Sequence, residues 1–234
     1  MRQIPATDTD RFLRYMIAPE VTAFSPLRDA VLPVHVVQAR QVHGDRTAVI
    51  TSAGTTREEL DGYDALVTDR PGIAIGARTA DCIPVLMYDP VHRAIAAVHS
   101  GWKGTVAKIS AKVLSVMNST YGTRASDILA VIGPGIGPDS FQVGPEVAEA
   151  FLKAGFPDTQ DLITDRGPRT PGSMCGGLHI DLWQANRLIL IQAGVPDSSI
   201  LVSGTDTYTH PEFFSARREG TACGRTVNTI IINR

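Results

Sequence analysis

The sequence of 234 residues has few cysteines, and none of its three lies in a C-x-x-C pair. The number of cysteines is odd, which argues against a disulfide framework and for a reducing compartment. They are Cys82, Cys175 and Cys223. We therefore expect all three thiols to be reduced. Each can then fill the core, bind a metal or act as a nucleophile.

Long apolar runs and runs of basic residues are also absent. No window approaches the roughly 20 apolar residues that cross a bilayer, and residues 1–16 lack the apolar stretch and cleavage site of a secretory signal. The formal net charge is −2 and no cluster of Lys and Arg occurs, so the electrostatic footprint of a nucleic-acid-binding protein is missing. We expect a cytoplasmic protein with neither a membrane nor a nucleic acid as partner.

The composition that is present is that of an ordinary globular protein, with 43% hydrophobic and 20% charged residues. A chain of this length can bury a full core as one unit. We expect a single domain over residues 1–234, as a monomer or a homodimer.

Short segments rich in valine and isoleucine are bounded by Gly, Pro or Asp, which predicts strands. These segments are 34–44, 47–52, 64–69, 73–78, 83–89, 94–100, 127–137, 199–204 and 227–233. Helical spacing of apolar residues predicts three helices at 103–122, 144–155 and 181–195, the second with Pro145 in its first turn and the third capped by Asp181. Many strands and few helices in irregular order favour a mixed α+β domain.

Two further segments of the chain are rich in Gly and Pro. The stretch 159–179 is interpreted as a mobile excursion near a pocket rather than a domain boundary. The stretch 133–144, "GPGIGPDSFQVG", resembles a phosphate-cradling loop only superficially, because no helix starts inside it and a third glycine is misplaced. We expect a pocket wall there and no NAD.

Three potential metal ligands stand where an expected strand meets a loop. His43 lies in "RQVHGD", Cys82 in "RTADC" and His99 in "AAVHSGWKG". Functional sites are usually built at such strand ends. Taken singly, however, a cysteine beside an apolar strand is more often a small buried hydrophobe, and a histidine there is more often a structural residue. The residues alone therefore leave a shared site open.

Six motifs resemble, in this order, those of one known family. They are "QVHG", "TADCIPVLMYDP", "AAVHSGWKGT", "IGPGIGPDSFQVGPEV", "HIDLWQANRLIL" and "FFSARREGTACGR". From about residue 36 to its C-terminus, the chain is similar to the family known as YfiH-like, laccase-domain or purine nucleoside phosphorylase proteins. The resemblance implies an α+β fold, a four-layer αββα sandwich with mixed β-sheets.

The resemblance also implies one pocket in which His43, Cys82 and His99 hold a zinc ion. Two imidazoles and one thiolate suit Zn²⁺, and three protein ligands leave the fourth tetrahedral position open. Such an ion lowers the pKa of a bound water towards 7. Copper is possible with the same donors, but the six histidines of this chain form no His-x-His pair. We therefore do not expect a multicopper laccase.

Catalytic roles are expected for Cys82 and His99 and for Asp81, which precedes the cysteine. Asp81 is positioned to orient a ligand or shuttle protons, and capping of a turn is the structural alternative. Whether Cys82 is purely a ligand or also a nucleophile stays open.

Substrate contacts are expected from Arg78, Lys103 and Arg217, which with Arg218 are candidates to hold an anion such as phosphate; a solvated surface charge is the simpler interpretation of each. Trp102 follows the His99 motif and can stack on a purine.

Weaker candidates for the pocket are five phenylalanine or histidine side chains and one departure from the family pattern. Core packing is the simpler role for most of the phenylalanines. Relatives often have "CTYT" where this chain has "DTYT". We expect this difference to affect the rim of the pocket and not the three proposed ligands. The residues concerned are Phe141, Phe213, Phe214, His179, His210 and Asp206.

The function that the resemblance implies is a zinc-dependent purine nucleoside phosphorylase that acts on adenosine, inosine and S-methyl-5'-thioadenosine and also deaminates adenosine. Purine nucleosides and phosphate are then the partners. The alternatives are a cysteine-type amidase that edits peptidoglycan precursors, with Cys82 as nucleophile and His99 as base, a copper polyphenol oxidase, and a module that binds a metal or partner without catalysis.

Overall fold

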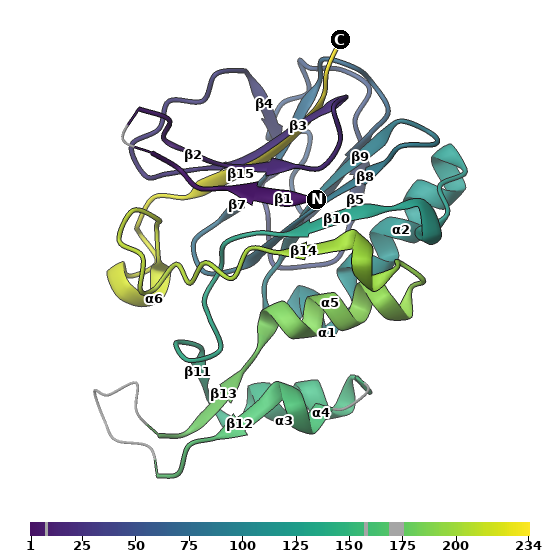
Figure 1. Ribbon diagram of the computed structural model, residues 1–234. Helices are drawn as coiled ribbons and strands as arrows, with labels where there is room; N and C mark the ends of the chain where they lie inside the picture. Colours follow the sequence, from purple (N-terminus) through teal and green to yellow (C-terminus); the bar gives the residue numbers. More distant parts are fainter. Residues whose placement is uncertain (8, 157–158, 169–175) are drawn as a thin grey trace.

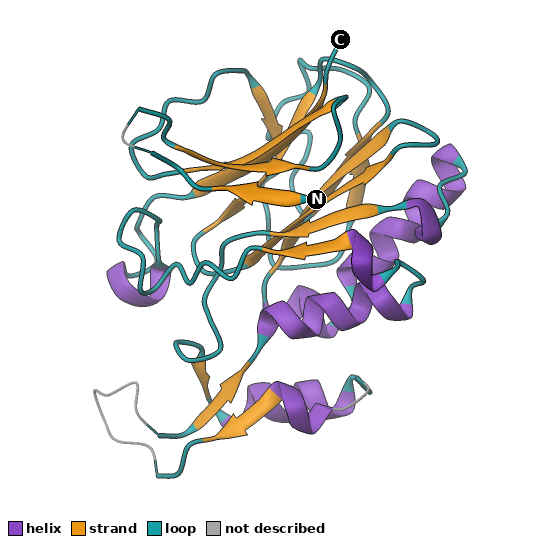
Figure 2. Ribbon diagram, in the orientation of Figure 1, coloured by secondary structure: helices purple, strands orange, loops and turns teal. Residues whose placement is uncertain are grey.

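The computed structural model describes residues 1–234 except 8, 157–158 and 169–175. Two six-stranded sheets lie face to face, and helices cover the outer face of the second sheet (Figures 1 and 2). Each sheet contains both parallel and antiparallel neighbours. The expected α+β fold with mixed sheets is therefore confirmed.

The first sheet has the strand order β1, β2, β3, β15, β7, β4. Its neighbours are antiparallel except β4 and β7. The strand bounds are Arg2–Ile4 for β1, Phe12–Met16 for β2, Val21–Pro26 for β3, Thr226–Ile232 for β15, Ala74–Thr79 for β7 and Val36–Gln38 for β4. The first three were not predicted, because their apolar segments are short and are interrupted by polar or charged residues.

The second sheet has the order β14, β10, β8, β9, β6, β5. Its central strands β8 (Ile83–Asp89) and β9 (Ala94–Ser100) are buried along their whole length, because one face meets the first sheet and the other meets the helices. This explains why both segments are almost continuously apolar. The other bounds are Ile200–Val202 for β14, Leu129–Ile132 for β10, Ala65–Thr68 for β6 and Thr47–Val49 for β5.

The helices α1 (Trp102–Val106), α2 (Ile109–Tyr121) and α5 (Leu182–Gln192) lie along the second sheet (Figure 1). The single helix predicted at 103–122 is thus two helices, because Lys108 adopts a left-handed φ of 56° between them. The predicted cap of α5 is confirmed: the Asp181 carboxylate accepts a hydrogen bond from the Gln184 amide at 2.8 Å.

The predicted second helix is also present, as α3 (Pro145–Lys153), which begins at Pro145. Two short helices, α4 (Thr159–Leu162) and α6 (Ala216–Glu219), were not predicted. No helix of the described residues is both long enough and apolar enough to span a membrane.

The stretch 159–179, interpreted from its composition as a mobile excursion near a pocket, contains helical and strand segments. Besides α4, it contains β12 (Ile163–Asp165) and most of β13 (Leu178–Ile180), which form a small sheet with β11 (Gln142–Val143). The Gly- and Pro-rich composition therefore did not indicate these strands, which main-chain pairing between β12 and β13 stabilises. Cys175, expected to be a reduced thiol, lies outside the described residues.

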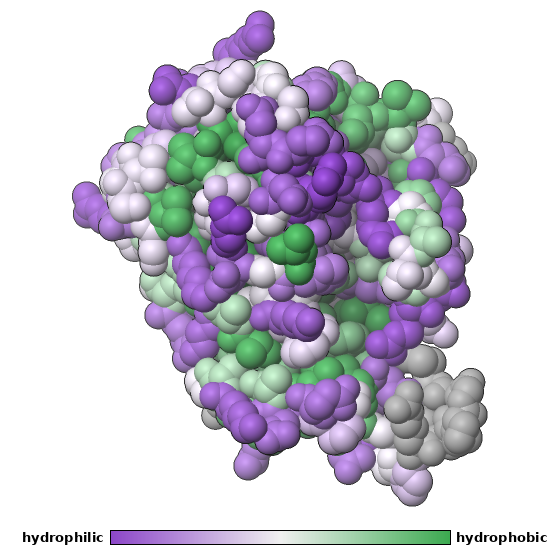
Figure 3. All heavy atoms as spheres, turned by 180° about the vertical axis from the view of Figure 1, so that it is seen from behind, coloured by the Kyte–Doolittle hydropathy of each residue, from purple (hydrophilic) through white to green (hydrophobic). Residues whose placement is uncertain are grey.

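Two hydrophobic cores hold these layers together. One lies between the sheets and includes Tyr15, Leu86 and Ile230. The other lies between the second sheet and the helices and includes Met87 and Phe151. Burying each such side chain contributes about 1.5–3 kcal/mol. On the face seen in Figure 3, hydrophilic residues dominate and hydrophobic ones form small separate groups, as is usual for a protein surface.

Candidate metal centre and its pocket

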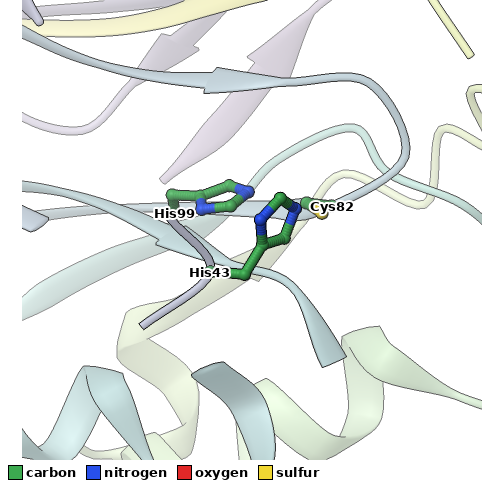
Figure 4. A group of neighbouring side chains, drawn as sticks. All are labelled: His43, Cys82 and His99. Carbon is green, nitrogen blue, oxygen red and sulfur yellow. The ribbon is translucent and has the colours of Figure 1, made fainter. Parts of the chain in front are cut away.

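His43, Cys82 and His99 converge, with one potential ligand atom from each lying within 4.8 Å of the others (Figure 4). The pairing of β8 with β9 brings Cys82 and His99 together. Pro84 of β8 faces His99 of β9, and Cys82 directly precedes β8. His43 comes from the loop after β4, and its ring lies 4.9 Å from the ring of His99, nearly perpendicular to it. The sequence placed these three residues at strand ends, and the structure brings them into one cluster.

Asp64, which sequence reasoning missed, organises two of the three. Its Oδ1 lies 2.8 Å from Nδ1 of His99 and accepts the amide of His43 at 2.9 Å, while its Oδ2 accepts the amides of Val42 and Gly44. With Nδ1 of His99 so engaged, Nε2 is the nitrogen left for a metal. A carboxylate behind a ligand histidine fixes its ring and tautomer in this way. The available signal was a single aspartate at the start of a strongly apolar strand.

The charges in the cluster favour a thiolate. Burial alone would raise the pKa of the Cys82 thiol, but the positive charge of His99 and hydrogen bonds from His43 and His99 lower it to about 6. Burial alone would lower the pKa of His99, whereas the Cys82 thiolate and the Asp64 carboxylate raise it to about 9. Near pH 7 the metal-free cluster therefore holds a thiolate beside an imidazolium.

The backbone around the cluster is tightly constrained. His43 and Asp81 have left-handed φ values of 61° and 85°, which cost a non-glycine residue on the order of 1–3 kcal/mol. A Cβ added to Gly101 would lie 3.0 Å from Cys82 Sγ and 3.1 Å from His43 Cδ2. Only glycine at this position lets both side chains approach the site without displacement.

The donor set fits a metal ion. Two imidazole nitrogens and one thiolate sulfur bind zinc at about 2.0–2.3 Å, which requires the donor atoms to be close to one another, as they are here. The lowered pKa of Cys82 supplies the deprotonated sulfur that metal binding requires. His43 is exposed, Cys82 is partly exposed and His99 is buried, so the cluster opens on one side.

That open side faces a pocket of about 680 Å³. Of the residues predicted to contact substrate, Arg78, Trp102 and Arg217 line this pocket, as does Phe141. Lys103 is not among the lining residues; its ammonium lies 5.6 Å from the centre of the Trp102 ring.

Asp81 also lines the pocket, but both of its carboxylate oxygens have donors. Oδ1 accepts the hydroxyl of Thr207 at 2.7 Å and Oδ2 accepts the amide of Arg217 at 2.7 Å. The guanidinium of Arg217 in turn donates to the carbonyl of Gln142 at 3.0 Å. Asp81 therefore joins two segments of the pocket wall, and proton transfer by this residue stays a prediction.

The weaker candidates lie elsewhere. Arg218 donates to the carbonyls of Thr207, Tyr208 and Phe213. The His179 ring is buried, with Nδ1 3.1 Å from the carbonyl of Gly177. His210 and Phe213 line a second cavity, and Phe214 packs against Arg28. None of these five residues lines the pocket of the metal centre.

Asp206, where relatives often have cysteine, stabilises the pocket wall. Its carboxylate accepts the amides of Gly137 at 3.0 Å and Tyr208 at 2.9 Å and the hydroxyl of Ser140 at 2.5 Å. The departure from the family pattern thus acts on the loop 133–140 and not on the three ligands.

Five further polar residues of the pocket were not predicted: Arg40, Gln41, Arg57, Thr221 and Arg225. Gln41 stands next to the metal motif, so proximity was a usable signal. Arg57 lies outside the family motifs and no local pattern marks it, whereas Thr221 and Arg225 stand in the motif "FFSARREGTACGR", which was a usable signal.

Comparison with known proteins matches residues 25–233 to a family model described as multi-copper polyphenol oxidoreductase laccase. A protein of Bacteroides thetaiotaomicron named purine nucleoside phosphorylase is 42% identical over 207 residues, which are 88% of this chain and 74% of that protein. A protein of an unknown prokaryotic organism named adenosine deaminase RL5 is 42% identical over 202 residues, 83% of this chain and 74% of that protein.

Solved structures show the same fold. YfiH of Bacillus licheniformis superimposes with a TM-score of 0.85 at 26% identity, covering 97% of this chain and 98% of that chain. YlmD of Geobacillus stearothermophilus superimposes with a TM-score of 0.80 at 24% identity and covers both chains fully. With its fold, its motifs and nearly its whole length matched, the chain belongs to the multi-copper polyphenol oxidoreductase laccase family.

Proposed function

We propose that this protein is a zinc-dependent purine nucleoside phosphorylase that also deaminates adenosine. The observation that carries the proposal is the convergence of two histidines and a low-pKa cysteine at an open pocket with basic walls. The names of the two relatives above support the same class of substrate. Adenosine, inosine and S-methyl-5'-thioadenosine are the proposed nucleosides.

The zinc ion would be held by His43, Cys82 and His99. Asp64 would position both histidines through its contacts with the His43 amide and the His99 ring. When bound, zinc supplies a Lewis acid and a means of generating a nucleophile from water at neutral pH. The chain's own contribution is the thiolate, since the neighbouring histidines keep the pKa of Cys82 at about 6.

In the deamination of adenosine, the oxygen of water forms a bond to C6 of the base, the bond from C6 to the amino nitrogen breaks, and ammonia leaves. Trp102, Phe141 and Ile136 line the pocket and provide apolar surface for the planar base. Asp81 contributes by tying the strand before Cys82 to the segments of Thr207 and Arg217.

In phosphorolysis, an oxygen of phosphate forms a bond to C1' of the ribose while the bond from C1' to the base nitrogen breaks. The electron pair of that bond stays on the base, which takes up a proton. This reaction needs a site for an anion beside the nucleoside, and Arg78 and Arg217 are the predicted residues that line the pocket. Lys103, outside the lining, would act only through Trp102.

The test is an assay of purified protein with adenosine and phosphate, with and without a chelator. We expect adenine and inosine as products, and loss of both activities in the chelated protein with recovery on addition of zinc. Zinc-replete protein that forms neither product from adenosine, and no hypoxanthine from inosine, would overturn the proposal.

A second candidate is a cysteine-type amidase, and the thiolate of Cys82 beside His99 is the observation that favours it. A nucleophile of this kind remains active without metal and is blocked by alkylation. If zinc-free protein hydrolyses an amide of a peptidoglycan precursor and alkylation of Cys82 abolishes that activity, the amidase replaces the zinc enzyme. Turnover of a phenol by copper-loaded protein would instead support the oxidase that the family description names.

A further inference from the structure

The walls of the metal-centre pocket carry five arginines, from four separate segments of the chain, and they are not equivalent. These are Arg40, Arg57, Arg78, Arg217 and Arg225. Arg40 is neutralised by Glu58, whose carboxylate accepts from its guanidinium at 3.0 Å. Arg217 uses its guanidinium to hold the carbonyl of Gln142 and lies against the ring of Phe141.

The other three form a group that we call the arginine cluster: Arg57, Arg78 and Arg225. All three line the same pocket, and burial together with the positive charges of Arg57 and Arg225 lowers the pKa of Arg78, so both neighbours act on Arg78. Within the described residues, none of the three has an ion pair with a carboxylate. Asp81, the acidic residue of the pocket lining, already has a donor on each oxygen.

The cluster is held in place beside the metal ligands. The Gln41 side chain accepts the Arg78 amide at 2.8 Å and donates to the Arg78 carbonyl at 2.8 Å. These bonds tie the segment that leads to His43 to the strand that leads to Cys82. The guanidinium of Arg225 is anchored on the carbonyls of Thr221 and Gly224, both at 2.9 Å. Carbonyls orient this side chain without neutralising it.

Three cations held together without a counter-ion repel one another, and an anion bound between them removes that repulsion. Guanidinium groups are also the side chains that bind the oxygens of phosphate through paired, charge-assisted hydrogen bonds. The position of the cluster on the wall of the same pocket suits an anion that reacts with a molecule bound at the metal centre.

We propose that Arg57, Arg78 and Arg225 form the binding site for inorganic phosphate, the co-substrate of phosphorolysis. This inference rests on the proposed function and deepens it, because it assigns the anion to one wall of the pocket. It assigns different roles to Arg78 and Arg217, because the guanidinium of Arg217 donates to the carbonyl of Gln142.

The two proposed reactions differ in their need for this site. Phosphorolysis consumes phosphate, whereas deamination consumes only water. Removing the cluster should therefore impair one reaction and spare the other, which loss of the metal or of the pocket shape would not do. Substitution of the Arg78 side chain leaves its bonds to Gln41 intact, since these use the main chain of Arg78.

The experiment compares zinc-loaded wild type with Arg57→Gln and Arg78→Gln, and with Arg124→Gln as a matched control on an exposed arginine outside the pocket. Loss of a charge-assisted hydrogen bond predicts a KM for phosphate raised about 10- to 100-fold in either cluster variant. The kcat/KM for adenosine deamination should stay within about twofold, and the zinc content and the control should match wild type.

Direct titration of inorganic phosphate into the zinc-loaded proteins separates this inference from the proposed function. If wild type binds phosphate and Arg78→Gln does not, but no nucleoside is cleaved, the site stands and the proposed function fails. If wild type performs phosphorolysis with a KM for phosphate that both cluster variants share, the site is wrong and the function stands. Tight, Arg78-dependent binding of adenosine monophosphate with no binding of inorganic phosphate would also overturn the assignment.

Discussion

Nδ1 of His99 lies 2.8 Å from Oδ1 of Asp64, and both residues are buried where β6 and β9 pair. The same carboxylate accepts three successive amides of the loop that carries His43. Hydrogen bonds to His99 and to this loop outweigh burial and lower the pKa of Asp64. One aspartate thus positions two candidate ligands, one from the sheet and one from a loop.

Asp64→Asn should weaken zinc binding by about 10- to 100-fold, the usual cost of losing a carboxylate behind a ligand histidine. The amide keeps the shape of the side chain but loses its charge and two of its acceptor sites. Competition with a chromophoric chelator measures the affinity. Asp197→Asn, which removes a carboxylate bonded to Arg187 at the surface, is the control, and equal affinities in the two variants would contradict the role of Asp64.

Cys82→Ala should abolish stoichiometric zinc in the purified protein, because two histidines alone cannot supply the three donors of this site. Elemental analysis measures the metal content. The matched variant Cys223→Ala removes a thiol that contacts Arg225 and belongs to no metal-ligand group in the described residues, and it should keep its zinc. Zinc retained in Cys82→Ala would refute the ligand assignment.

Alkylation of Cys82 in metal-free protein should follow an apparent pKa of about 6 instead of the ordinary value of 9.0. Since the thiolate is the reactive form, lowering the pH from 9 to 7 should change the rate little, and the rate should fall only as the pH drops through about 6. Mass spectrometry after short exposure to iodoacetamide gives the rate at Cys82.

Bound zinc should protect the Cys82 thiol from alkylation. If the metal-free rate instead declines steadily between pH 9 and pH 8, the thiolate is not stabilised by its histidine neighbours. Fast alkylation of the zinc-loaded protein would show that Cys82 is not a ligand.

Gly101→Ala should weaken zinc binding without removing any ligand, because the added Cβ would meet Cys82 Sγ at 3.0 Å and His43 Cδ2 at 3.1 Å. We expect a loss of affinity of about 10-fold or more, as overpacking of this kind costs roughly 1–3 kcal/mol. Gly54→Ala is the control, since its Cβ would come no closer than 3.6 Å to a neighbour. Competition with the chromophoric chelator measures the zinc affinity of both variants. A wild-type affinity in Gly101→Ala would contradict the prediction.

Asp206→Ala should lower the free energy of unfolding by about 1–3 kcal/mol, because it leaves the amides of Gly137 and Tyr208 and the hydroxyl of Ser140 without their acceptor. Urea denaturation of the zinc-loaded protein measures this. Asp206→Asn keeps one acceptor oxygen and should lose less. Zinc content should be unchanged in both, and a loss of zinc would show that this loop also supports the metal centre.

Local pattern predicted much of the fold. The apolar segments that became β4 to β10, β14 and β15 were recognisable as short runs rich in valine, isoleucine and alanine, and the signal was strongest for β8 and β9, which are buried along their whole length. Pro145 and Asp181 marked the starts of α3 and α5, since both act on their own first turn. The N-terminal strands and the small sheet escaped detection because they are short and depend on pairing with other strands rather than on local propensity; β3, for example, pairs with the distant β15.

The sequence by itself determined which donors are available for the candidate metal centre, since His43, Cys82 and His99 stand in motifs that resemble those of one family, although the three residues taken singly left a shared site open. Only the tertiary structure decided how that chemistry is supported. Asp64 reaches His99 through the register of β6 with β9, and Arg57, Arg78 and Arg225 meet from distant segments. Contacts of this kind depend on how strands pair and loops close around a shared core, and no local pattern of residues encodes that arrangement.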